Sequence, residues 1–162
     1  MKKKALYAGS FDPITCGHLD IIKRTSKMYD EVVVGVITNP NKNALFDVKE
    51  RTDMIACTTR NLDNIKIVSF SGLLAKYVND NHFDVVIRGL RVTTDFEYEI
   101  QMAQMNSRLY NKDIETVFLM TQPKYSFISS SMIKEVVMLG GEVKGLVPDE
   151  ICELTKSKFN IK

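Results

Sequence analysis

Residues 5–18 read ALYAGSFDPITCGH, which is a short apolar run, a turn-rich loop and the start of an amphipathic segment. Gly9, at the end of the run, permits a close backbone approach or a positive φ. Gly17 keeps a helix start free of a Cβ. His18 then falls in the first helical turn, beside unpaired N–H groups and the positive end of the helix dipole. A strand, a loop and a helix N-terminus in this order predict a phosphate site.

The rest of the chain repeats this order of strand and helix. The expected strands are at residues 5–8, 32–38, 65–70, 85–88 and 116–120. The expected helices are at residues 19–29, 47–59, 73–81, 95–110, 130–139 and 148–158. Asp47 and Glu50 form a capping-box arrangement at the second of them. The fourth is expected to place Phe96, Ile100, Ala103 and Leu109 roughly on one side, while its Met102 and Met105 fit either a core or an interface. VVVGVI and VVI, within the second and fourth strands, are near-continuous apolar strings of the kind found in parallel sheets covered on both faces. The pattern predicts an α/β fold: a doubly wound five-stranded parallel sheet with carboxyl-terminal helices.

Size and composition indicate an ordinary globular protein, with residues 1–162 as a single domain. The 22 basic and 20 acidic residues are too balanced for a nucleic-acid binder. The three cysteines are widely spaced without a CxxC pair, which fits neither a disulfide framework nor a zinc site. Free thiols, and no apolar run near 18 residues, predict a cytoplasmic protein without a membrane partner.

Ligands of such sheets bind beyond the carboxyl ends of the strands, where the strand order reverses. The chemistry is therefore expected in the loops after the first, second, fourth and fifth strands. The loop after the second strand, TNPNKN, carries Lys42, a mobile point charge suited to a phosphate, although such a lysine is usually only solvated. After the fifth strand, ISSS at residues 128–131 offers more hydroxyls than one helix cap requires, and with free N–H groups these could form a second phosphate cradle.

The fourth strand ends in RGLR, which places Arg88 and Arg91 at the same edge. Guanidinium groups match phosphate oxygens, so the two arginines could grip separate phosphates. The competing interpretation is structural ion pairing, for example with Asp95 or Glu99.

Two common nucleotide-binding motifs are absent. Neither GxGxxG nor GxxxxGK[ST] occurs, which argues against a dehydrogenase and a P-loop kinase. Residues 15–18, TCGH, are instead similar to the [HT]xGH signature of the nucleotidyltransferase superfamily, and ISSSMIK resembles its second signature.

Five segments together carry a closer resemblance: GSFDPITCGHLDII at 9–22, FSGLL at 70–74, IRGLR at 87–91, DFEYE at 95–99 and YSFISSSMIKEV at 125–136. They resemble the bacterial phosphopantetheine adenylyltransferases over nearly the whole chain. The resemblance implies a Rossmann-like nucleotidyltransferase fold. It also implies a homohexamer that converts ATP and 4′-phosphopantetheine into dephospho-coenzyme A and pyrophosphate, with Mg²⁺ held mainly by phosphates and water rather than by side chains.

The resemblance also implies roles for single residues. Ser10 and Phe11 would contact ATP, and Ser10 would also meet the acceptor phosphate. His18 would stabilise the pentavalent α-phosphate, Lys42 and Arg88 would hold the acceptor phosphate, and Leu74 would meet the pantetheine arm. The other ATP-binding positions would be Gly89, Leu90, Arg91, Glu99, Tyr125, Ser126, Phe127, Ile128, Ser129, Ser130 and Ser131. Catalysis would depend on His18, Lys42 and Arg91.

A few positions depart from the pattern of the family. Tyr125 replaces a tryptophan found in some members, which keeps an aromatic ring, and Ser10 replaces a threonine, which keeps the hydroxyl. Gly72 stands where some members have an aspartate, so no role is expected for it.

Two other functions stay open at this point. One keeps the chemistry but changes the acceptor, for example to nicotinate mononucleotide. The other is a nucleotide-binding module without catalysis, which would bind ATP and release no pyrophosphate.

Overall fold

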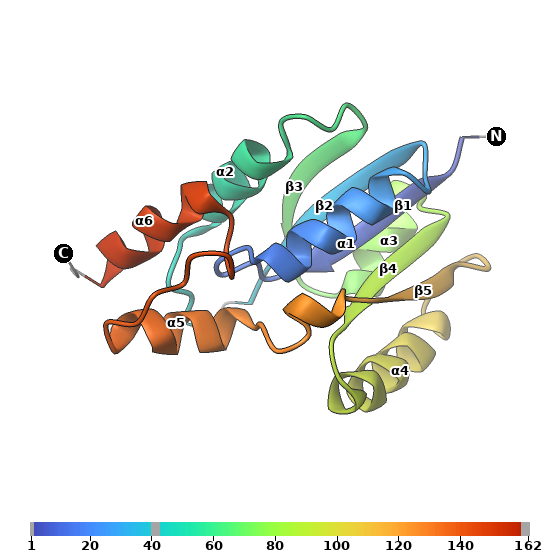
Figure 1. The fold of residues 1–162 in the computed structure, drawn as a ribbon. Coiled ribbons are helices and arrows are strands. Elements are labelled where there is room, and N and C mark those ends of the chain that lie inside the picture. The colour runs from blue at the N-terminus through green and yellow to red at the C-terminus, as the bar shows by residue number, and fades with distance from the viewer. Residues whose placement is uncertain (1, 40–42, 160–162) are drawn as a thin grey trace.

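A computed structural model describes residues 2–39 and 43–159. Its five strands are β1 (Lys4–Gly9), β2 (Glu31–Thr38), β3 (Ile65–Ser71), β4 (Val85–Leu90) and β5 (Glu115–Met120). They form one sheet in the order β3-β2-β1-β4-β5, and every neighbouring pair is parallel (Figure 1). The order reverses between β1 and β4, so the carboxyl ends of these two strands flank the crevice expected to bind ligands.

Helices cover both faces of this sheet. They are α1 (Cys16–Ser26), α2 (Val48–Thr59), α3 (Leu74–Asn81), α4 (Thr93–Ser107), α5 (Ser130–Met138) and α6 (Asp149–Lys158), with a short 3₁₀ turn at Pro123–Tyr125. The doubly wound α/β fold and its carboxyl-terminal helices are therefore confirmed. None of the helices in the described part of the chain is long and apolar enough to cross a membrane.

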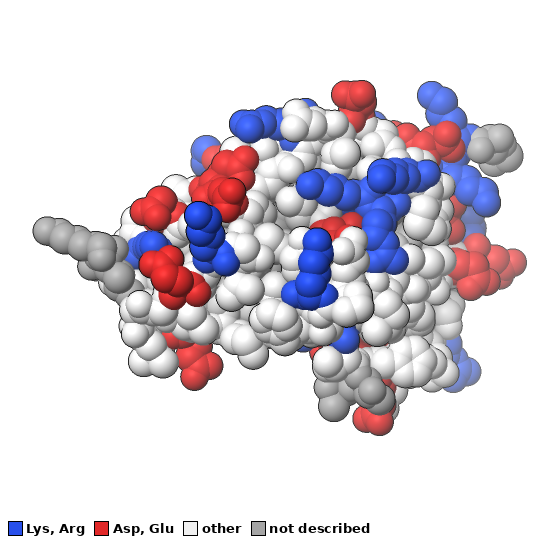
Figure 2. All heavy atoms as spheres, in the orientation of Figure 1, with Lys and Arg blue, Asp and Glu red and all other residues white. Residues whose placement is uncertain are grey.

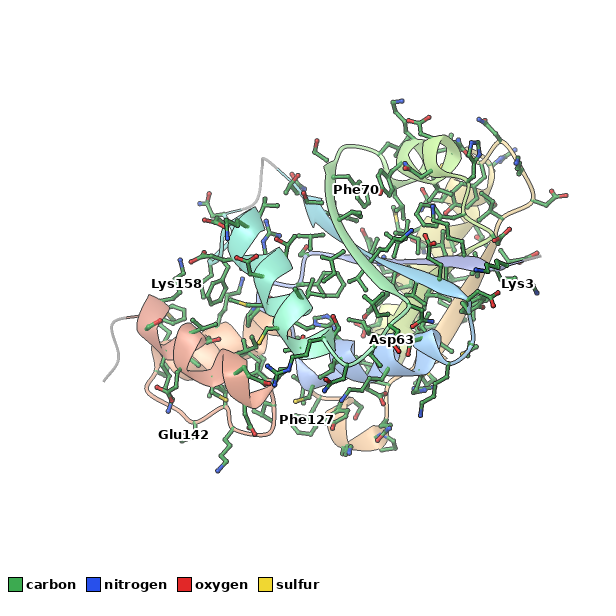
Figure 3. All side chains as sticks on the ribbon, turned by 90° about the horizontal axis from the view of Figure 1, so that it is seen from above. Lys3, Asp63, Phe70, Phe127, Glu142 and Lys158 are labelled. Carbon is green, nitrogen blue, oxygen red and sulfur yellow. The ribbon has the colours of Figure 1, made fainter. Side chains whose placement is uncertain are left out.

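Alternation along the strands divides the core into two layers. In β1, Ala5 and Tyr7 belong to the core that also contains side chains of α1, α2, α5 and α6, whereas Leu6 and Ala8 belong to the core that contains Val78 of α3. In the view from above, Lys158 of α6 lies beside α2, on the side of the first core layer (Figure 3). Phe70 of β3, which packs on the second core layer, lies away from these two helices. Strands buried on both faces explain the near-continuous apolar strings.

Two expected helix boundaries differ from the structure for a local reason. The first helix, expected at residues 19–29, begins at Cys16, because Thr15 caps it and accepts a hydrogen bond from the His18 N–H. The last helix, expected from residue 148, begins one residue later, with Pro148 as its N-cap. The capping box of α2, from Asp47 and Glu50, is present as predicted.

The apolar side of α4 is not the one expected from the sequence. Phe96 and Leu109 were expected on a common inward side with Ile100 and Ala103, but each is 42% exposed. Met102 and Met105, which fitted either a core or an interface, are also exposed. The side chains of α4 that point inward include the charged Glu99. The contacts of this cavity residue, rather than the apolar pattern of the sequence, therefore determine which side of α4 faces the protein.

Gly35, in the middle of β2, leaves room for a ring that packs against the sheet. A Cβ at this position would lie 2.7 Å from Cε1 of Phe70, whose ring stacks on Tyr77 with centroids 3.9 Å apart. We expect Gly35→Ala to lower the free energy of unfolding by about 1–3 kcal/mol, as overpacking does. Urea unfolding would measure this, and Gly35→Ala combined with Phe70→Leu should recover part of the loss. An unchanged midpoint for Gly35→Ala would contradict this packing.

Candidate active site

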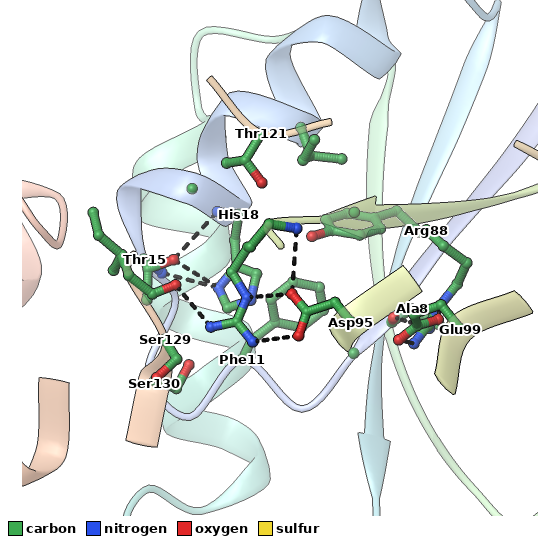
Figure 4. A pocket seen from close by; sticks show the side chains of 17 residues that line it. Ala8, Phe11, Thr15, His18, Arg88, Asp95, Glu99, Thr121, Ser129 and Ser130 are labelled. Atoms are coloured by element: carbon green, nitrogen blue, oxygen red, sulfur yellow. Dashed lines mark hydrogen bonds and ion pairs between the residues drawn. The ribbon is translucent and has the colours of Figure 1, made fainter. Parts of the chain in front are cut away.

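A cavity of about 230 Å³ opens at the carboxyl ends of β1 and β4, where the strand order reverses. We call it the His18 cavity (Figure 4). Its walls come from β1 and the loop after it, the start of α1, the end of β4, α4 and the start of α5. Its lining residues are Tyr7, Ala8, Gly9, Phe11, Thr15, Gly17, His18, Ile21, Arg88, Gly89, Arg91, Asp95, Glu99, Thr121, Ile128, Ser129 and Ser130.

The N-terminus of α1 holds the His18 ring in a fixed orientation. The Thr15 N–H donates to Nδ1 of His18 at 3.1 Å, while the Thr15 hydroxyl accepts from the His18 N–H at 3.3 Å. The ring of Phe11 meets the imidazole edge-on, with centroids 5.1 Å apart. Since Nδ1 accepts the backbone hydrogen bond, we assign the imidazole proton to Nε2.

The imidazole of His18 is neutral at physiological pH. Burial, with a smaller contribution from the nearby charge of Arg91, lowers its pKa from 6.5 to about 4. His18 therefore offers the cavity an uncharged Nε2–H donor rather than a second cation.

Titration of His18 tests this assignment. We expect the ring nitrogen signals to remain those of a neutral Nε2–H imidazole from pH 8 to about 5, and to change only near pH 4. Because the unfolded chain takes up the proton at higher pH than the folded chain, this group also lowers the free energy of unfolding as the pH falls from about 6.5 towards 4. Long-range ¹H–¹⁵N spectra would follow the ring, and His18→Gln would identify its signals. Protonation near pH 6.5 would contradict the assignment.

Arg88 lies at the end of β4 and is held in a bidentate ion pair with Glu99 of α4. Its Nη2 donates to Oε1 of Glu99 at 2.7 Å and its Nε to Oε2, while Nη1 donates to the Ala8 carbonyl at 3.0 Å. The side chain of Glu99 is only 14% exposed. The pair thus fixes the guanidinium at the strand edge.

Arg91 forms the corresponding ion pair with Asp95, which lies one helical turn before Glu99 on α4. Its Nε and Nη2 donate to the two oxygens of Asp95 at 2.9 and 3.0 Å, and its Nη1 donates to the Ile128 carbonyl at 3.1 Å. The ion pairs named as the competing interpretation of Arg88 and Arg91 are therefore present, yet both guanidinium groups also line the His18 cavity.

A second cavity, of about 450 Å³, adjoins the first and shares Gly9, Arg88 and Glu99 with it. We call it the Leu74 cavity. Its walls come largely from the start of α3 and from α4, and they combine apolar with polar side chains. Its other lining residues are Ser10, Ile37, Asn39, Gly72, Leu73, Leu74, Val86, Tyr98, Met102, Ala103, Asn106, Tyr110 and Thr116. Arg88 thus lies between the His18 cavity and the larger Leu74 cavity.

Comparisons with known proteins agree with this geometry. Residues 6–136 match the family model described as cytidylyltransferase-like. A phosphopantetheine adenylyltransferase of Clostridium tetani is 54% identical over 158 residues, which cover 98% of each chain. One of Clostridium novyi is 57% identical over 147 residues, 91% of each chain. The chain belongs to the phosphopantetheine adenylyltransferase family.

Solved structures support the fold of this phosphopantetheine adenylyltransferase family member. A Vibrio parahaemolyticus protein proposed to be a nicotinate-nucleotide adenylyltransferase has a TM-score of 0.66 at 16% identity, with 96% of this chain and 99% of that chain covered. At this identity the likeness concerns the fold alone.

Most residues that family resemblance singled out meet in the two cavities. Ser10 and Leu74 line the Leu74 cavity, and Arg88 lines both. The members found around the His18 cavity are Phe11, His18, Gly89, Arg91, Glu99, Ile128, Ser129 and Ser130. Lys42 lies outside the described residues.

Five of the expected ATP-binding residues are placed elsewhere. Leu90, Tyr125, Ser126, Phe127 and Ser131 line neither the His18 cavity nor the Leu74 cavity. Ser10, which was also expected to contact ATP, lines the Leu74 cavity but not the His18 cavity. The side chain of Leu90 is buried in the core, whereas that of Phe127 is exposed. Ser131 lines a third cavity, described below.

The serines of α5 are partly used by the protein itself. Ser129 caps the helix, with its Oγ accepting from the Met132 N–H at 3.0 Å, and the Ser130 hydroxyl donates to the Pro13 carbonyl at 2.8 Å. A phosphate cradle here would therefore depend more on the free N–H groups of the first turn than on these hydroxyls.

Sequence reasoning missed the roles of Thr15 and Thr121. Thr15 orients His18, and the spacing T-x-x-H, which parallels a capping box, could have revealed it. Thr121 donates from its hydroxyl to the Leu90 carbonyl at 2.7 Å, and its methyl group would lie 3.3 Å from a Cβ at Gly17. No local sequence signal marks that second contact, because it joins segments far apart in the chain.

Proposed function

We propose that the protein transfers the adenylyl group of ATP to 4′-phosphopantetheine, giving dephospho-coenzyme A and pyrophosphate. The observation that carries this proposal is that one guanidinium, Arg88, borders both the His18 cavity at a helix N-terminus and the larger Leu74 cavity beside it. ATP would occupy the His18 cavity. The acceptor would place its phosphate near Arg88 and Ser10 and its pantetheine arm along Leu74.

The acceptor phosphate is already an anion near neutral pH, so the reaction needs neither a general base nor a covalent nucleophile of the enzyme. It needs the acceptor held in line with the α-phosphorus against the repulsion between two anions. Arg88, together with Lys42, would offset the acceptor charge. The ion pair with Glu99 orients Arg88 before the substrate binds. The pair also neutralises part of the Arg88 charge, so further positive groups could still help to offset the charge of the acceptor phosphate.

Charge that develops on the α-phosphate would be stabilised by the neutral Nε2–H of His18 and by the N-terminus of α1. Arg91 and the first turn of α5 would stabilise the departing pyrophosphate. Each of these donors is fixed by the fold before substrate binds, so little reorganisation is needed during the reaction.

Mg²⁺ is expected to accompany ATP, with most of its ligands from phosphate oxygens and water, and it would neutralise phosphate charge when bound. The described side chains fit this arrangement. No group of three or more His, Cys, Asp or Glu side chains among them could form a protein cage for a metal. Asp95 and Glu99, the carboxylates lining the His18 cavity, are bonded to arginines.

Two further expectations belong to this proposal. A homohexamer would cover exposed apolar side chains of α4, namely Tyr98, Met102 and Met105. A cytoplasmic location is supported by three free cysteines. On the face shown in Figure 2, basic side chains gather over the region of α1, and acidic side chains lie mainly to either side of them.

A coupled pyrophosphate assay tests the reaction. The purified protein would be incubated with ATP and Mg²⁺, and with 4′-phosphopantetheine, nicotinate mononucleotide or no acceptor. We expect pyrophosphate only with 4′-phosphopantetheine. Release with nicotinate mononucleotide instead would mean a different acceptor, and binding of ATP without release under any condition would mean a nucleotide-binding module.

A further inference from the structure

Arg51 of α2 is a buried arginine that the reaction described above does not use. The residue is only 5% exposed. Its Nη1 donates to the Ser10 carbonyl at 2.9 Å and lies 3.5 Å from the Ile37 carbonyl, and its Nε donates to the Asp47 carbonyl at 3.3 Å. One guanidinium thus joins the loop after β1, the end of β2 and the start of α2.

Arg51 differs from the arginines of the His18 cavity in its charge balance. Arg88 and Arg91 each face a carboxylate, Glu99 and Asp95 respectively. No carboxylate of the described residues lies within 4 Å of the Arg51 guanidinium. Carbonyl oxygens accept hydrogen bonds from its Nε and Nη1, but no carboxylate pairs with its charge, and an unpaired buried charge is costly for a protein to keep.

The charged groups around Arg51 are engaged with one another. Arg51 lines a third cavity, which shares Ser10, Ile37 and Asn39 with the Leu74 cavity. Within this Arg51 cavity the other charged groups are engaged as follows: Asp12 pairs with Lys134 at 2.9 Å, Glu50 pairs with Lys158 at 2.7 Å, and the carboxylate of Asp47 caps α2. After these two ion pairs, Arg51 and Asp47 are the charged lining residues of the described part of this cavity that form no ion pair within 4 Å, so Arg51 is the cation there whose charge no carboxylate neutralises directly.

We propose that Arg51 is a positioning and specificity-determining residue for the acceptor phosphate. This inference rests on the proposed function. Through the Ser10 carbonyl, Arg51 holds the residue expected to meet that phosphate. Its charge, which forms no ion pair with a carboxylate of the described residues, favours an acceptor that carries the phosphate over the same molecule without it, because in a site of low effective dielectric one unit charge several ångströms away changes an anion's affinity by a factor of ten or more.

Two substitutions separate the charge from the carbonyl contacts. Arg51→Gln removes the charge, whereas Arg51→Lys keeps the charge and loses the guanidinium fork. Calorimetric titration of each protein with 4′-phosphopantetheine and with pantetheine gives the ratio of the two affinities. Lys49→Gln is the matched control, because it removes one charge from the same helix at a side chain that is 83% exposed.

We expect Arg51→Gln to weaken binding of 4′-phosphopantetheine by roughly tenfold or more while pantetheine changes less than about threefold. Arg51→Lys and Lys49→Gln should keep the wild-type ratio within about threefold. An unchanged ratio in Arg51→Gln, or an equal loss in Arg51→Lys and Arg51→Gln, would overturn the inference, since a structural role alone would weaken both ligands together. A wild-type protein that binds 4′-phosphopantetheine but makes no dephospho-coenzyme A would contradict the proposed function. The ratio of the affinities for 4′-phosphopantetheine and pantetheine would still decide the role of Arg51 in that case.

Discussion

Replacing His18 by alanine is expected to lower kcat by roughly 10²- to 10³-fold, the cost of losing a single donor to the transition state. The affinity for ATP should change by less than about threefold, because the neutral Nε2–H of His18 is expected to act on charge that develops only during transfer. Single-turnover kinetics and equilibrium binding of ATP would measure the two effects separately.

His18→Ala also removes part of the helix cap, so a control is needed for the cap alone. Thr15→Ala deletes the hydroxyl that caps α1 but leaves the Thr15 N–H, which donates to Nδ1 of His18. We expect it to cost about 1 kcal/mol of stability and much less of kcat. If Thr15→Ala lowered kcat as far as His18→Ala, the imidazole would matter only as a cap.

Replacing Arg88 by methionine is expected to affect both folding and activity. The side chain of Glu99, which is 14% exposed, would lose its bidentate partner. Breaking a buried ion pair from one side typically costs about 3–5 kcal/mol in the free energy of unfolding. The kcat/KM for the acceptor should fall by at least about 10²-fold, since the charge between the two cavities would be lost.

A double variant separates these two effects. Arg88→Met combined with Glu99→Leu removes the unpaired carboxylate, so most of the lost stability should return, as it does when a buried ion pair is replaced by apolar side chains. The activity should stay low. Urea unfolding and steady-state kinetics would be compared for the single and double variants. Recovery of activity together with stability would show that Arg88 only supports the fold.

The parts of the fold predicted from sequence are those with a strong local signal. Apolar strings such as residues 32–37 predicted the strands, because a short, near-continuous apolar run is typical of a strand covered on both faces. Alternation with helices then predicted a doubly wound parallel sheet with its ligands at the carboxyl ends of the strands. The structure adds that the strand order reverses between β1 and β4, which places the loops after these two strands together. The capping box at Asp47 was equally local.

The parts that sequence could not predict depend on contacts between distant segments. The start of α1 was misplaced because the partnership of Thr15 and His18 is not a standard helix signal. In α4, burial of the charged Glu99 against Arg88 replaces the apolar face expected there, so Phe96 and Leu109 are left partly exposed. The unpaired charge of Arg51 is visible only in three dimensions, because sequence does not say which carboxylates lie nearby.

The stereochemical course of the transfer tests the proposed mechanism most directly. In this mechanism the acceptor phosphate would attack the α-phosphorus of ATP in a single in-line step, held by His18, Arg88 and Arg91, without a covalent enzyme intermediate. An ATP analogue with sulfur at a defined position on the α-phosphorus would be reacted with 4′-phosphopantetheine, and the configuration of the product would be determined. We predict inversion at phosphorus; retention of configuration would contradict this mechanism.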